Sequence, residues 1–355
     1  MTADSIGGVW IYTLELCRAL DIYGVDIHLA IMGGLPSNHQ REQLIELPHV
    51  TIYESDFKLE WMSEPWGDMQ RAQQWLIDIY TEVKPDLIHM NNYGQTNYEW
   101  NCPVITVFHS CVMTWWQSVK NEEAPEAWSQ YRDLVQTALN KSDFVVFPTN
   151  ALKEQAESIY GIIENTLIIY NGRDIETDTD IDKEPFIFSA GRLWDEAKNI
   201  STLAAVASEL SWPLYIAGET YENQDVEMAN VFTLGQLQSD EVLHWMARSM
   251  IYVHPAKYEP FGLSILEAAS SGCALAIADI DTLREIWGDS AIYFKPDVKS
   301  DILRAIESLA NNTTFRSEMA AKASQRASEY GRATMAAKYW SLYSSVLTNS
   351  KIQLT

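Results

Sequence analysis

The chain is poor in cysteine and in basic side chains, and each shortage excludes a class of protein. Its four cysteines among 355 residues form no Cys-x-x-Cys pair, which argues against a disulfide framework or a zinc site and fits a reducing cytosol. Lysine and arginine number 25 against 49 acidic residues, so the formal net charge is −24. Neither half of the chain offers the basic face that nucleic acid or an anionic membrane surface requires. We therefore expect no nucleic-acid partner and no electrostatic attachment to membranes.

Glycines and long apolar runs are equally restrictive. None of the 16 glycines forms a Gly-x-Gly triple, so the dinucleotide fingerprint is absent and a nicotinamide dehydrogenase is excluded. The longest stretch without a formal charge, residues 100–119, contains Asn101, Pro103 and Gln117 and is a poor membrane span. The first residues lack the basic patch and apolar segment of a secretory signal. These features predict a cytoplasmic protein.

What is present is an alternation of short apolar runs with helical patterns. Strands are expected at 25–31, 50–53, 87–90, 104–108, 144–147 and 167–169, and again at 186–190, 214–217, 231–234, 251–254, 274–278 and 292–294. Helices are expected between them, for example at 9–23, 69–82, 151–160, 240–250 and 301–310. This pattern predicts two doubly wound α/β units with parallel sheets. The acidic segment 172–185 is expected to connect them.

The run EPFGLSILE is the most informative motif. Glu259 follows an apolar strand and Pro255, and helical spacing begins after Phe261. The backbone N–H groups of Phe261, Gly262 and Leu263 therefore open a helix, which is an anion-binding geometry. Glu267, further along that helix, can accept two hydrogen bonds from a vicinal diol such as a ribose. Amides for a phosphate and a carboxylate for a ribose suit a nucleotide-sugar.

A second motif, FSAGRLWDEAKN at 188–199, places Arg192 and Lys198 on one loop after a strand. Two cations on a loop can stabilise the charge that develops on a departing diphosphate. Alone, the pair would be read as solvated surface side chains beside Asp195 and Glu196. The neighbouring EPFGLSILE motif favours the functional reading.

Together the two motifs resemble retaining GT-B glycosyltransferases, closest to glycosyltransferase family 4. Weaker resemblance extends over GGVWIYTLELCRAL (7–20), VFHS (107–110), YNGRD (170–174) and LREIW (283–287). The resemblance implies two Rossmann-like domains facing a cleft. It assigns residues 1–168 to an acceptor-binding domain and residues 169–331 to a donor-binding domain. It also implies that helices at 315–330 and 332–346 cross back, so that 332–355 packs on the first domain.

The resemblance also implies roles for the motif residues. Glu267 would hold the ribose, while Arg192 and Lys198 would hold the diphosphate. Glu259, with the amides of Phe261, Gly262 and Leu263, would position the sugar. The expected reaction is hexosyl transfer with retention from UDP-glucose or GDP-mannose to an acceptor hydroxyl, without metal or cofactor. The alternative is a catalytically silent GT-B module that binds a sugar nucleotide or glycan as a partner subunit.

Candidates in the first half are more ambiguous. His109 ends an apolar strand, and the resemblance implies that it contacts the donor sugar or assists the acceptor; a packed core histidine is the alternative. Gly7 and Gly8 precede a helix and would let an acceptor or the donor approach, or would simply form a turn. Trp115 and Trp116 are candidates for stacking on an acceptor sugar, against the usual packing role.

Two further expectations concern structure. For His28, His89 and His254, which lie on or beside strands, structural roles are expected. Residues 1–4 resemble the end of the first, central strand of such a domain. We therefore expect the natural protein to begin upstream, or the chain to have been shortened at an internal methionine.

Overall fold

A computed structural model describes residues 1–96, 98–175, 181–218 and 229–353. They divide into two compact units. The first comprises Met1–Gln117, Glu122–Gly172 and Arg332–Thr355, and the second comprises Ser118–Asn121 and Arg173–Gly331. The boundary thus falls between residues 172 and 173, at the start of the predicted acidic connection, of which 176–180 lie outside the described residues.

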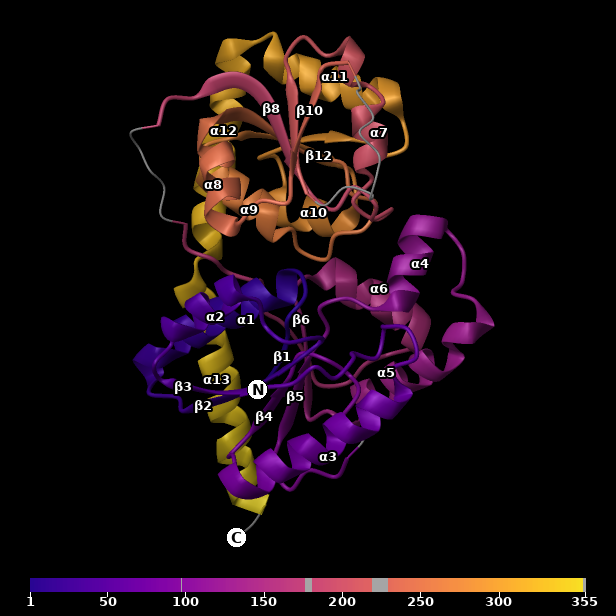
Figure 1. Cartoon of the computed structure of the whole chain (residues 1–355), viewed down its shortest axis with the longest axis vertical. Coiled ribbons are helices and arrows are strands. Elements are labelled where there is room, and N and C mark those ends of the chain that lie inside the picture. Colours follow the sequence, from indigo (N-terminus) through magenta and orange to yellow (C-terminus); the bar gives the residue numbers. More distant parts are fainter. Residues whose placement is uncertain (97, 176–180, 219–228, 354–355) are drawn as a thin grey trace. The chain divides into compact units, whose positions relative to one another are not determined.

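The first unit contains two parallel sheets (Figure 1). One has the order β1-β2-β3 and the other the order β4-β5-β6-β7. The strands are β1 (Thr2–Asp4), β2 (Ile27–Met32), β3 (Val50–Glu54), β4 (Ile88–Met90), β5 (Val104–Val107), β6 (Phe144–Phe147) and β7 (Thr166–Ile168). Most strand residues are buried, as parallel strands covered on both faces require. The six strands predicted in this half are confirmed, with boundary shifts of one or two residues.

Residues 2–4 form a strand, as their resemblance predicted. In β1, Thr2, Ala3 and Asp4 pair in parallel with Ala30, Ile31 and Met32 of β2. Side chains link β1 to β4: the Asn91 amide nitrogen donates to the Thr2 carbonyl oxygen at 2.8 Å, and the Asn91 backbone N–H donates to Thr2 Oγ1 at 2.9 Å. Asn91 therefore gives these polar groups of β1 partners at the point where the two sheets meet.

Helices surround these strands, and one of them comes from the far end of the sequence. They are α1 (Gly8–Leu20), α2 (Asn38–Ile45), α3 (Trp66–Val83), α4 (Val112–Lys120), α5 (Ser129–Lys141), α6 (Asn150–Tyr160) and α13 (Arg332–Gln353), with short 3₁₀ turns η1 (Asp21–Tyr23) and η2 (Glu126–Trp128). Helix α13 packs beside α1 and buries Met335, Tyr339 and Leu342 in the core of this unit. Burial of these apolar side chains holds the C-terminal helix in the first unit.

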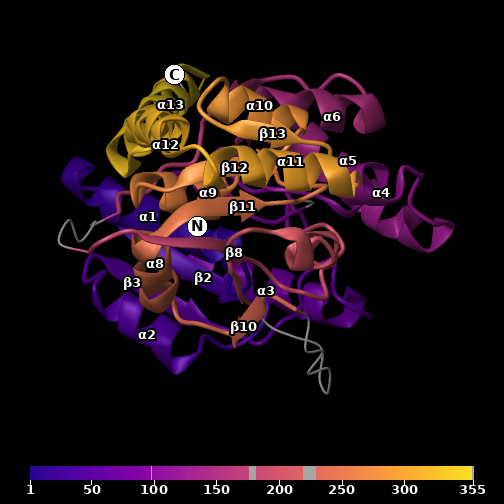
Figure 2. The ribbon, with the colours of Figure 1, turned by 90° about the horizontal axis from the view of Figure 1, so that it is seen from above.

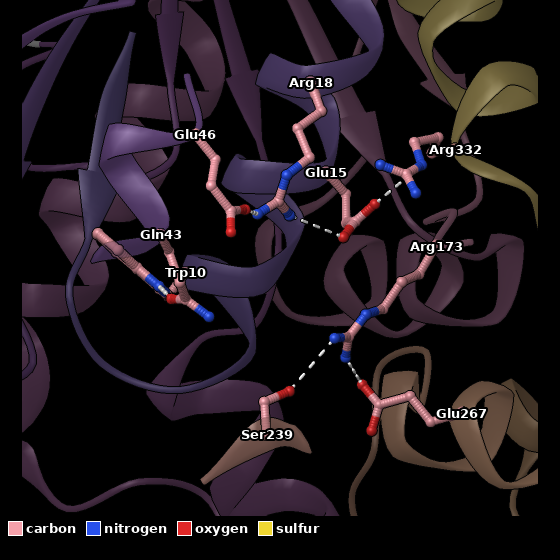
Figure 3. Close-up of polar contacts among 9 residues, drawn as sticks. All are labelled: Trp10, Glu15, Arg18, Gln43, Glu46, Arg173, Ser239, Glu267 and Arg332. Atoms are coloured by element: carbon pink, nitrogen blue, oxygen red, sulfur yellow. Dashed lines mark hydrogen bonds and ion pairs between the residues drawn. The ribbon is translucent and has the colours of Figure 1, made fainter. Parts of the chain in front are cut away.

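An ion-pair cluster fastens the start of α13 (Figure 3). The buried carboxylate of Glu15, on α1, accepts a hydrogen bond from Arg18 at 3.1 Å and lies 3.4 Å from Nε of Arg332, the first residue of α13. Arg18 also pairs with the exposed Glu46 at 2.7 Å. Removing either cationic partner from a buried carboxylate is strongly destabilising. The cluster therefore favours this placement of α13.

The second unit contains one parallel sheet with the order β10-β9-β8-β11-β12-β13 (Figure 2). Its strands are β8 (Glu184–Ala190), β9 (Leu214–Ala217), β10 (Val231–Gly235), β11 (Ser249–His254), β12 (Ala274–Ala278) and β13 (Ile292–Phe294). Its helices are α7 (Ile200–Ala204), α8 (Ser239–Arg248), α9 (Leu263–Ser270), α10 (Asp281–Trp287), α11 (Lys299–Ala310) and α12 (Thr313–Ala327), with 3₁₀ turns η3 (Ala207–Glu209) and η4 (Ser328–Tyr330). The predicted strands and the doubly wound α/β fold are confirmed.

Two helix predictions need correction. Helix α12 packs on α9 and β12 within the second unit, so the expectation that segment 315–330 crosses back is wrong; the cross-over begins at Arg332. Helix α8 ends at Arg248 rather than 250, because Ser249 already pairs with Glu184 in the sheet. For α8, helical spacing continued past the point where strand pairing redirects the chain; for α12, the helix was predicted but the unit on which it packs was not.

His89 has the structural role that was expected for it. Its buried ring lies with Nδ1 2.7 Å from the Tyr343 hydroxyl of α13 and Nε2 3.1 Å from Oδ1 of Asn91. Burial lowers the pKa of His89 to about 3. The ring is therefore neutral, and it links β4 to α13.

The unfolding free energy is expected to fall as the pH drops from 6.5 toward 3, in part because of His89. Its folded pKa of about 3 lies below the ordinary value of 6.5, so the unfolded state binds more protons in this window. The contribution of the neutral His89 ring to the free energy of unfolding is therefore fully present above pH 6.5. It is lost on acidification, by about 1.4 kcal/mol per pH unit. Urea denaturation of wild type and His89→Gln at several pH values should show the shallower slope in the variant. Parallel curves would contradict the assignment.

Candidate functional site

The two loops singled out by sequence meet at one edge of the second sheet. Strands β8 and β11 are hydrogen-bonded neighbours, and the strand order reverses its direction between them. Loop 191–199 follows β8, and loop 255–262 follows β11. The carboxyl ends of two such strands form the topological switch point at which doubly wound sheets bind ligands.

Lys198 and Glu259 are in direct contact at this point. Nζ of Lys198 donates to Oε2 of Glu259 at 2.6 Å, and Nε2 of His254 lies 3.0 Å from the same oxygen. The Glu259 side chain is 13% exposed and that of Lys198 is 26% exposed. The structure therefore brings together two of the predicted residues and adds His254, for which only a structural role was expected.

The charges in this cluster are determined by its contacts. Burial alone would raise the pKa of Glu259, but attraction to Lys198 and the hydrogen bond from His254 outweigh it and hold that pKa far below its usual range. Burial lowers the pKa of His254, partly opposed by Glu259. Glu259 is thus a carboxylate facing an ammonium and a neutral imidazole, and His254 must donate its Nε2 proton.

Arg192 lies on the same loop but pairs locally. Its guanidinium donates to Asp195 at 2.8 Å and lies 4.8 Å from the ring centre of Trp194. The side chain is 42% exposed, so a ligand can reach it. Arg192 and Lys198 therefore have different carboxylate partners and do not converge on one group in the structure as it stands.

Asn199 holds the two loops in register. It adopts a left-handed conformation with φ of 54°, and its side-chain amide donates to the carbonyl oxygens of Pro255 at 3.0 Å and Pro296 at 2.9 Å. The Lys257 N–H donates to the Ala197 carbonyl oxygen at 2.8 Å. Sequence reasoning missed Asn199; its place directly after Lys198 was the only signal.

The start of α9 has the predicted geometry. Gly262 has φ of 90°, which L side chains rarely adopt, and a Cβ there would lie 2.8 Å from Ile265 Cδ1. In the described part of the chain, the N–H groups of Phe261, Gly262 and Leu263 donate no backbone hydrogen bond. The helix N-terminus thus offers amides that an anion can occupy, next to Glu259.

Glu267 has a partner that the sequence did not reveal (Figure 3). Its carboxylate, almost fully buried on α9, accepts a hydrogen bond from Nη1 of Arg173, and Nη2 of Arg173 lies 3.3 Å from the Ser239 hydroxyl. Arg173 is the first residue after the boundary between the units. Its only sequence signal was its position in YNGRD. Glu267 is thus paired with Arg173, and not with Arg192 or Lys198.

The other predicted residues belong to the first unit. His109 follows β5, with Nε2 2.9 Å from Asn91 Oδ1. Gly7 has φ of 75°, and a Cβ added at Gly7 or Gly8 would meet no atom within 4 Å, so the start of α1 is open to approach. Trp115 and Trp116, half-buried on α4, lie edge to face with ring centres 5.8 Å apart.

Gly218→Ala is expected to disturb the loop that carries Arg192. Gly218 follows β9 with φ of 150°, and a Cβ there would lie 1.9 Å from the carbonyl oxygen of Gly191. Two backbones would have to separate, which should lower the free energy of unfolding by about 1–3 kcal/mol or more. Gly235→Ala is the matched control, because its φ is also positive but no atom lies within 4 Å; it should cost about 1 kcal/mol. Equal losses in urea denaturation would refute the role of the close approach.

Neither a metal cluster nor a membrane-spanning helix is found among the described residues. No three His, Cys, Asp or Glu side chains there gather as a metal site would need. Among the helices in the described ranges, none combines the length and the apolar character needed to cross a bilayer.

Two family models together match most of the chain. Residues 6–177 match the family model for Glycosyltransferase Family 4, and residues 173–330 match the model for Glycosyl transferases group 1. The serotype-specific mannosyltransferase WbdA of Escherichia coli is 27% identical over 115 residues, which are 32% of this chain but only 14% of WbdA. Glycogen synthase of Mycobacterium tuberculosis is 23% identical over 90% of this chain and 86% of that protein.

Solved structures share the fold. Sucrose-phosphate synthase from Thermosynechococcus elongatus superposes with a TM-score of 0.81 at 16% identity, covering 98% of this chain and 95% of that one. HepE of Anabaena, in complex with UDP and glucose, superposes with a TM-score of 0.73 at 17% identity, covering 97% and 100%. The chain therefore belongs to the GT-B glycosyltransferases of the family 4 and group 1 type.

Proposed function

We propose that the protein transfers a hexosyl group from a nucleoside-diphosphate sugar to an acceptor hydroxyl with retention of anomeric configuration. One observation carries the proposal. Lys198 and Glu259 meet at the switch point of the second sheet, beside the N-terminus of α9. The Lys198 cation and the backbone amides that open α9 suit a diphosphate. The Glu267 carboxylate, one helix turn or more further along, suits a ribose.

Each residue has a distinct part in this reaction. Lys198, Arg192 and the amides of Phe261, Gly262 and Leu263 stabilise the diphosphate as negative charge develops on it. Glu259, ionised and held by Lys198 and His254, orients Lys198 and positions the sugar. These groups supply the charge without a metal ion or cofactor in this proposal.

Glu267 accepts hydrogen bonds from the ribose hydroxyls while Arg173 holds its carboxylate. A carboxylate has about four lone-pair sites, so it can bond a guanidinium and a diol together. The guanidinium of Arg173 is in direct contact with this carboxylate, and hydrogen bonds between charged partners are stronger than those between neutral ones.

The donor and acceptor are proposed from chemistry and from the relatives. UDP-glucose and GDP-mannose are the leading donors: HepE binds UDP and glucose, and WbdA is described as a mannosyltransferase. The acceptor is a carbohydrate or small molecule, with Gly7, Trp115 and Trp116 as its candidate contacts. Gly8 is a candidate donor contact, and His109 is a candidate catalytic residue that contacts the donor sugar or assists the acceptor. The net charge of −24 disfavours nucleic acid and an anionic membrane as partners.

A second candidate, a silent GT-B module that binds a sugar nucleotide without turnover, is favoured by one observation. The charged donor-site side chains already have partners within the protein: Lys198 with Glu259, Arg192 with Asp195, and Glu267 with Arg173. If a bound donor does not displace these internal ion pairs, the cations do not reach its diphosphate. The donor then binds without reacting.

A thermal-shift screen against UDP, GDP, ADP and dTDP tests the binding part. Only a nucleotide that binds the folded state raises the apparent melting temperature. Transfer or hydrolysis of the corresponding radiolabelled sugar nucleotide then separates the two candidates. Stabilisation with turnover supports the transferase, and stabilisation without turnover supports the silent module. No stabilisation by any of the four refutes the nucleotide site.

A further inference from the structure

The two oxygens of the Glu259 carboxylate have different surroundings within the second unit. Oε2 accepts a hydrogen bond from Nζ of Lys198 at 2.6 Å and lies 3.0 Å from Nε2 of His254. No hydrogen bond to Oε1 is present among the described residues, and the side chain is 13% exposed. The backbone is fixed as well, because the Thr282 hydroxyl donates to the Glu259 carbonyl oxygen at 2.6 Å. Both internal partners of the carboxylate therefore share one oxygen.

These two partners differ in their freedom to move. Lys198 lies on loop 191–199 with its side chain 26% exposed, and its ammonium is carried by a flexible four-carbon stem. His254 ends strand β11, which is paired on both sides, with β8 and with β12. Its ring is 2% exposed and stacks on that of Tyr252 with centres 6.2 Å apart. A ligand can therefore draw Lys198 away from Oε2, whereas the His254 ring stays in place.

The His254 ring directs a hydrogen at Oε2 of Glu259. Burial lowers the pKa of His254, partly opposed by Glu259, so the ring is neutral. Its Nδ1 is buried and has no hydrogen-bond partner in the described part of the chain. An imidazolium would bury a charged N–H there without an acceptor, which is more costly than an unpaired lone pair. The one hydrogen of the ring is therefore on Nε2, in a charge-assisted bond to the carboxylate.

The other ionisable groups around this pair do not substitute for its partners. Those groups are Lys198 from the loop after β8, Tyr252 from β11 and Glu267 from α9. Burial raises the pKa of Tyr252, so its phenol is neutral, and Glu267 is an acid already paired with Arg173. Among the described residues, His254 is thus the hydrogen-bond donor that remains for the Glu259 side chain once Lys198 has left.

We propose that His254 is a positioning residue that keeps the Glu259 carboxylate charged and in place when the diphosphate of a donor draws Lys198 away. The inference rests on the proposed function and deepens it. A buried carboxylate that loses every partner either takes up a proton or strongly destabilises the fold. The Nε2 hydrogen of His254 prevents both outcomes. The internal ion pair can therefore open for the diphosphate while Glu259 remains an anion in a fixed position.

The shared oxygen is tested without any ligand by urea denaturation at neutral pH. Lys198→Ala and His254→Leu each leave Glu259 with one partner, and the double variant leaves it with none. The urea midpoint of the double variant is expected to fall by more than the sum of the two single losses. In a Glu259→Gln background the two losses should add. Simple addition in both backgrounds would overturn the proposal, whether or not the protein binds a nucleotide.

His254→Gln is the conservative variant, because a glutamine amide can donate to the same carboxylate oxygen. Combined with Lys198→Ala, it should show no loss beyond addition. A Lys198→Ala, His254→Leu protein that fails to fold while the glutamine combination folds counts as the expected excess loss. His244→Leu, on the exposed face of α8, is the control for removal of an imidazole as such, and its loss should simply add to that of Lys198→Ala.

Binding of UDP tests the exchange of partners directly. In wild type, Glu259 keeps the His254 hydrogen when the diphosphate takes Lys198, so the carboxylate binds no proton. In His254→Leu it has no donor left and is expected to take up about one proton as UDP binds. Isothermal titration at pH 7.5 in two buffers of different ionisation enthalpy counts these protons. The UDP affinity of this variant should also fall by up to about tenfold for each unit that the pH rises, more steeply than that of wild type.

The His254→Gln variant should resemble wild type in this titration. Equal proton uptake by wild type and His254→Leu would overturn the proposal. GDP, ADP or dTDP replaces UDP if that nucleotide is the one that stabilises the protein. If none of the four binds, the proposed nucleotide site is refuted, and the urea cycle alone decides whether His254 supports Glu259 in the absence of Lys198.

Discussion

Lys198→Ala is expected to lower kcat by about 10²–10³-fold, because it removes a cation aimed at the developing charge of the leaving diphosphate. Nζ of Lys198 lies 2.6 Å from Oε2 of Glu259, in the loop before α9, next to amides that donate no backbone hydrogen bond within the described part of the chain. The cation and the amides act on the same region, so losing one weakens the site without abolishing it. Arg192→Ala is expected to lower kcat by a similar factor, because the Arg192 side chain is 42% exposed on the same loop and a ligand can reach it. Steady-state kinetics with the donor found in the thermal-shift screen measures both.

Loss of Lys198 also leaves the Glu259 carboxylate buried without its ammonium, which can cost stability. Lys198→Arg keeps the charge and should recover part of the rate, whereas a purely structural defect would not depend on charge. Lys257→Ala is the matched control, because Lys257 pairs with Asp297 at 2.5 Å instead of Glu259. If both Lys198→Ala and Arg192→Ala left donor affinity and rate untouched, the assignment of this loop would be wrong.

Glu267→Ala should weaken nucleotide binding by about 1.5–3 kcal/mol, the contribution of hydrogen bonds to a charged group. This corresponds to roughly a 10- to 150-fold higher Kd. The almost fully buried carboxylate is held by Arg173, so its geometry is set before the ligand arrives. Isothermal titration with the stabilising nucleoside diphosphate measures the change. Glu318→Ala, on the exposed face of α12, is a suitable control and should bind as wild type does.

Arg173 offers a sharper version of the same test. Arg173→Ala removes the partner of Glu267 and leaves the carboxylate in place. If Arg173 positions Glu267, the two substitutions should be non-additive in a double-mutant cycle, because each disables the same contact. A simple sum of the two effects would show that Arg173 and Glu267 act separately. An unchanged Kd in Glu267→Ala would remove the ribose contact from the proposal.

Much of the fold could be predicted because burial produces local patterns of apolar residues in the sequence. A parallel strand covered on both faces is an almost continuous apolar run, and Val104–Val107 or Ala274–Ala278 can be recognised by inspection. The loop that carries Glu259 was predictable for a similar reason: a strand, a proline and a glycine before a helical pattern leave few alternatives. Helix ends were less accurate, as α8 shows, because tertiary pairing and not local spacing stops it at Arg248.

The contacts that decide the charges of the site had no such trace. Arg173 and Glu267 are 94 positions apart, and Lys198 and Glu259 are 61 apart. His254 looked structural beside Pro255, yet its ring donates to Glu259. Asn91 reaches Thr2 across 89 positions. These pairs share no periodicity or spacing that one sequence can display.

The sequence by itself determined the alternation of strands and helices, the loop that carries Glu259, the loop that carries Arg192 and Lys198, and the family to which the chain belongs. Only the tertiary structure decided which cation meets which carboxylate, that α12 stays with the second unit while α13 returns to the first, and that His109 is held by Asn91. The reason is physical: element type follows from local periodicity and burial, whereas an ion pair or hydrogen bond between distant residues exists only once the path of the folded backbone brings their side chains within about 3 Å.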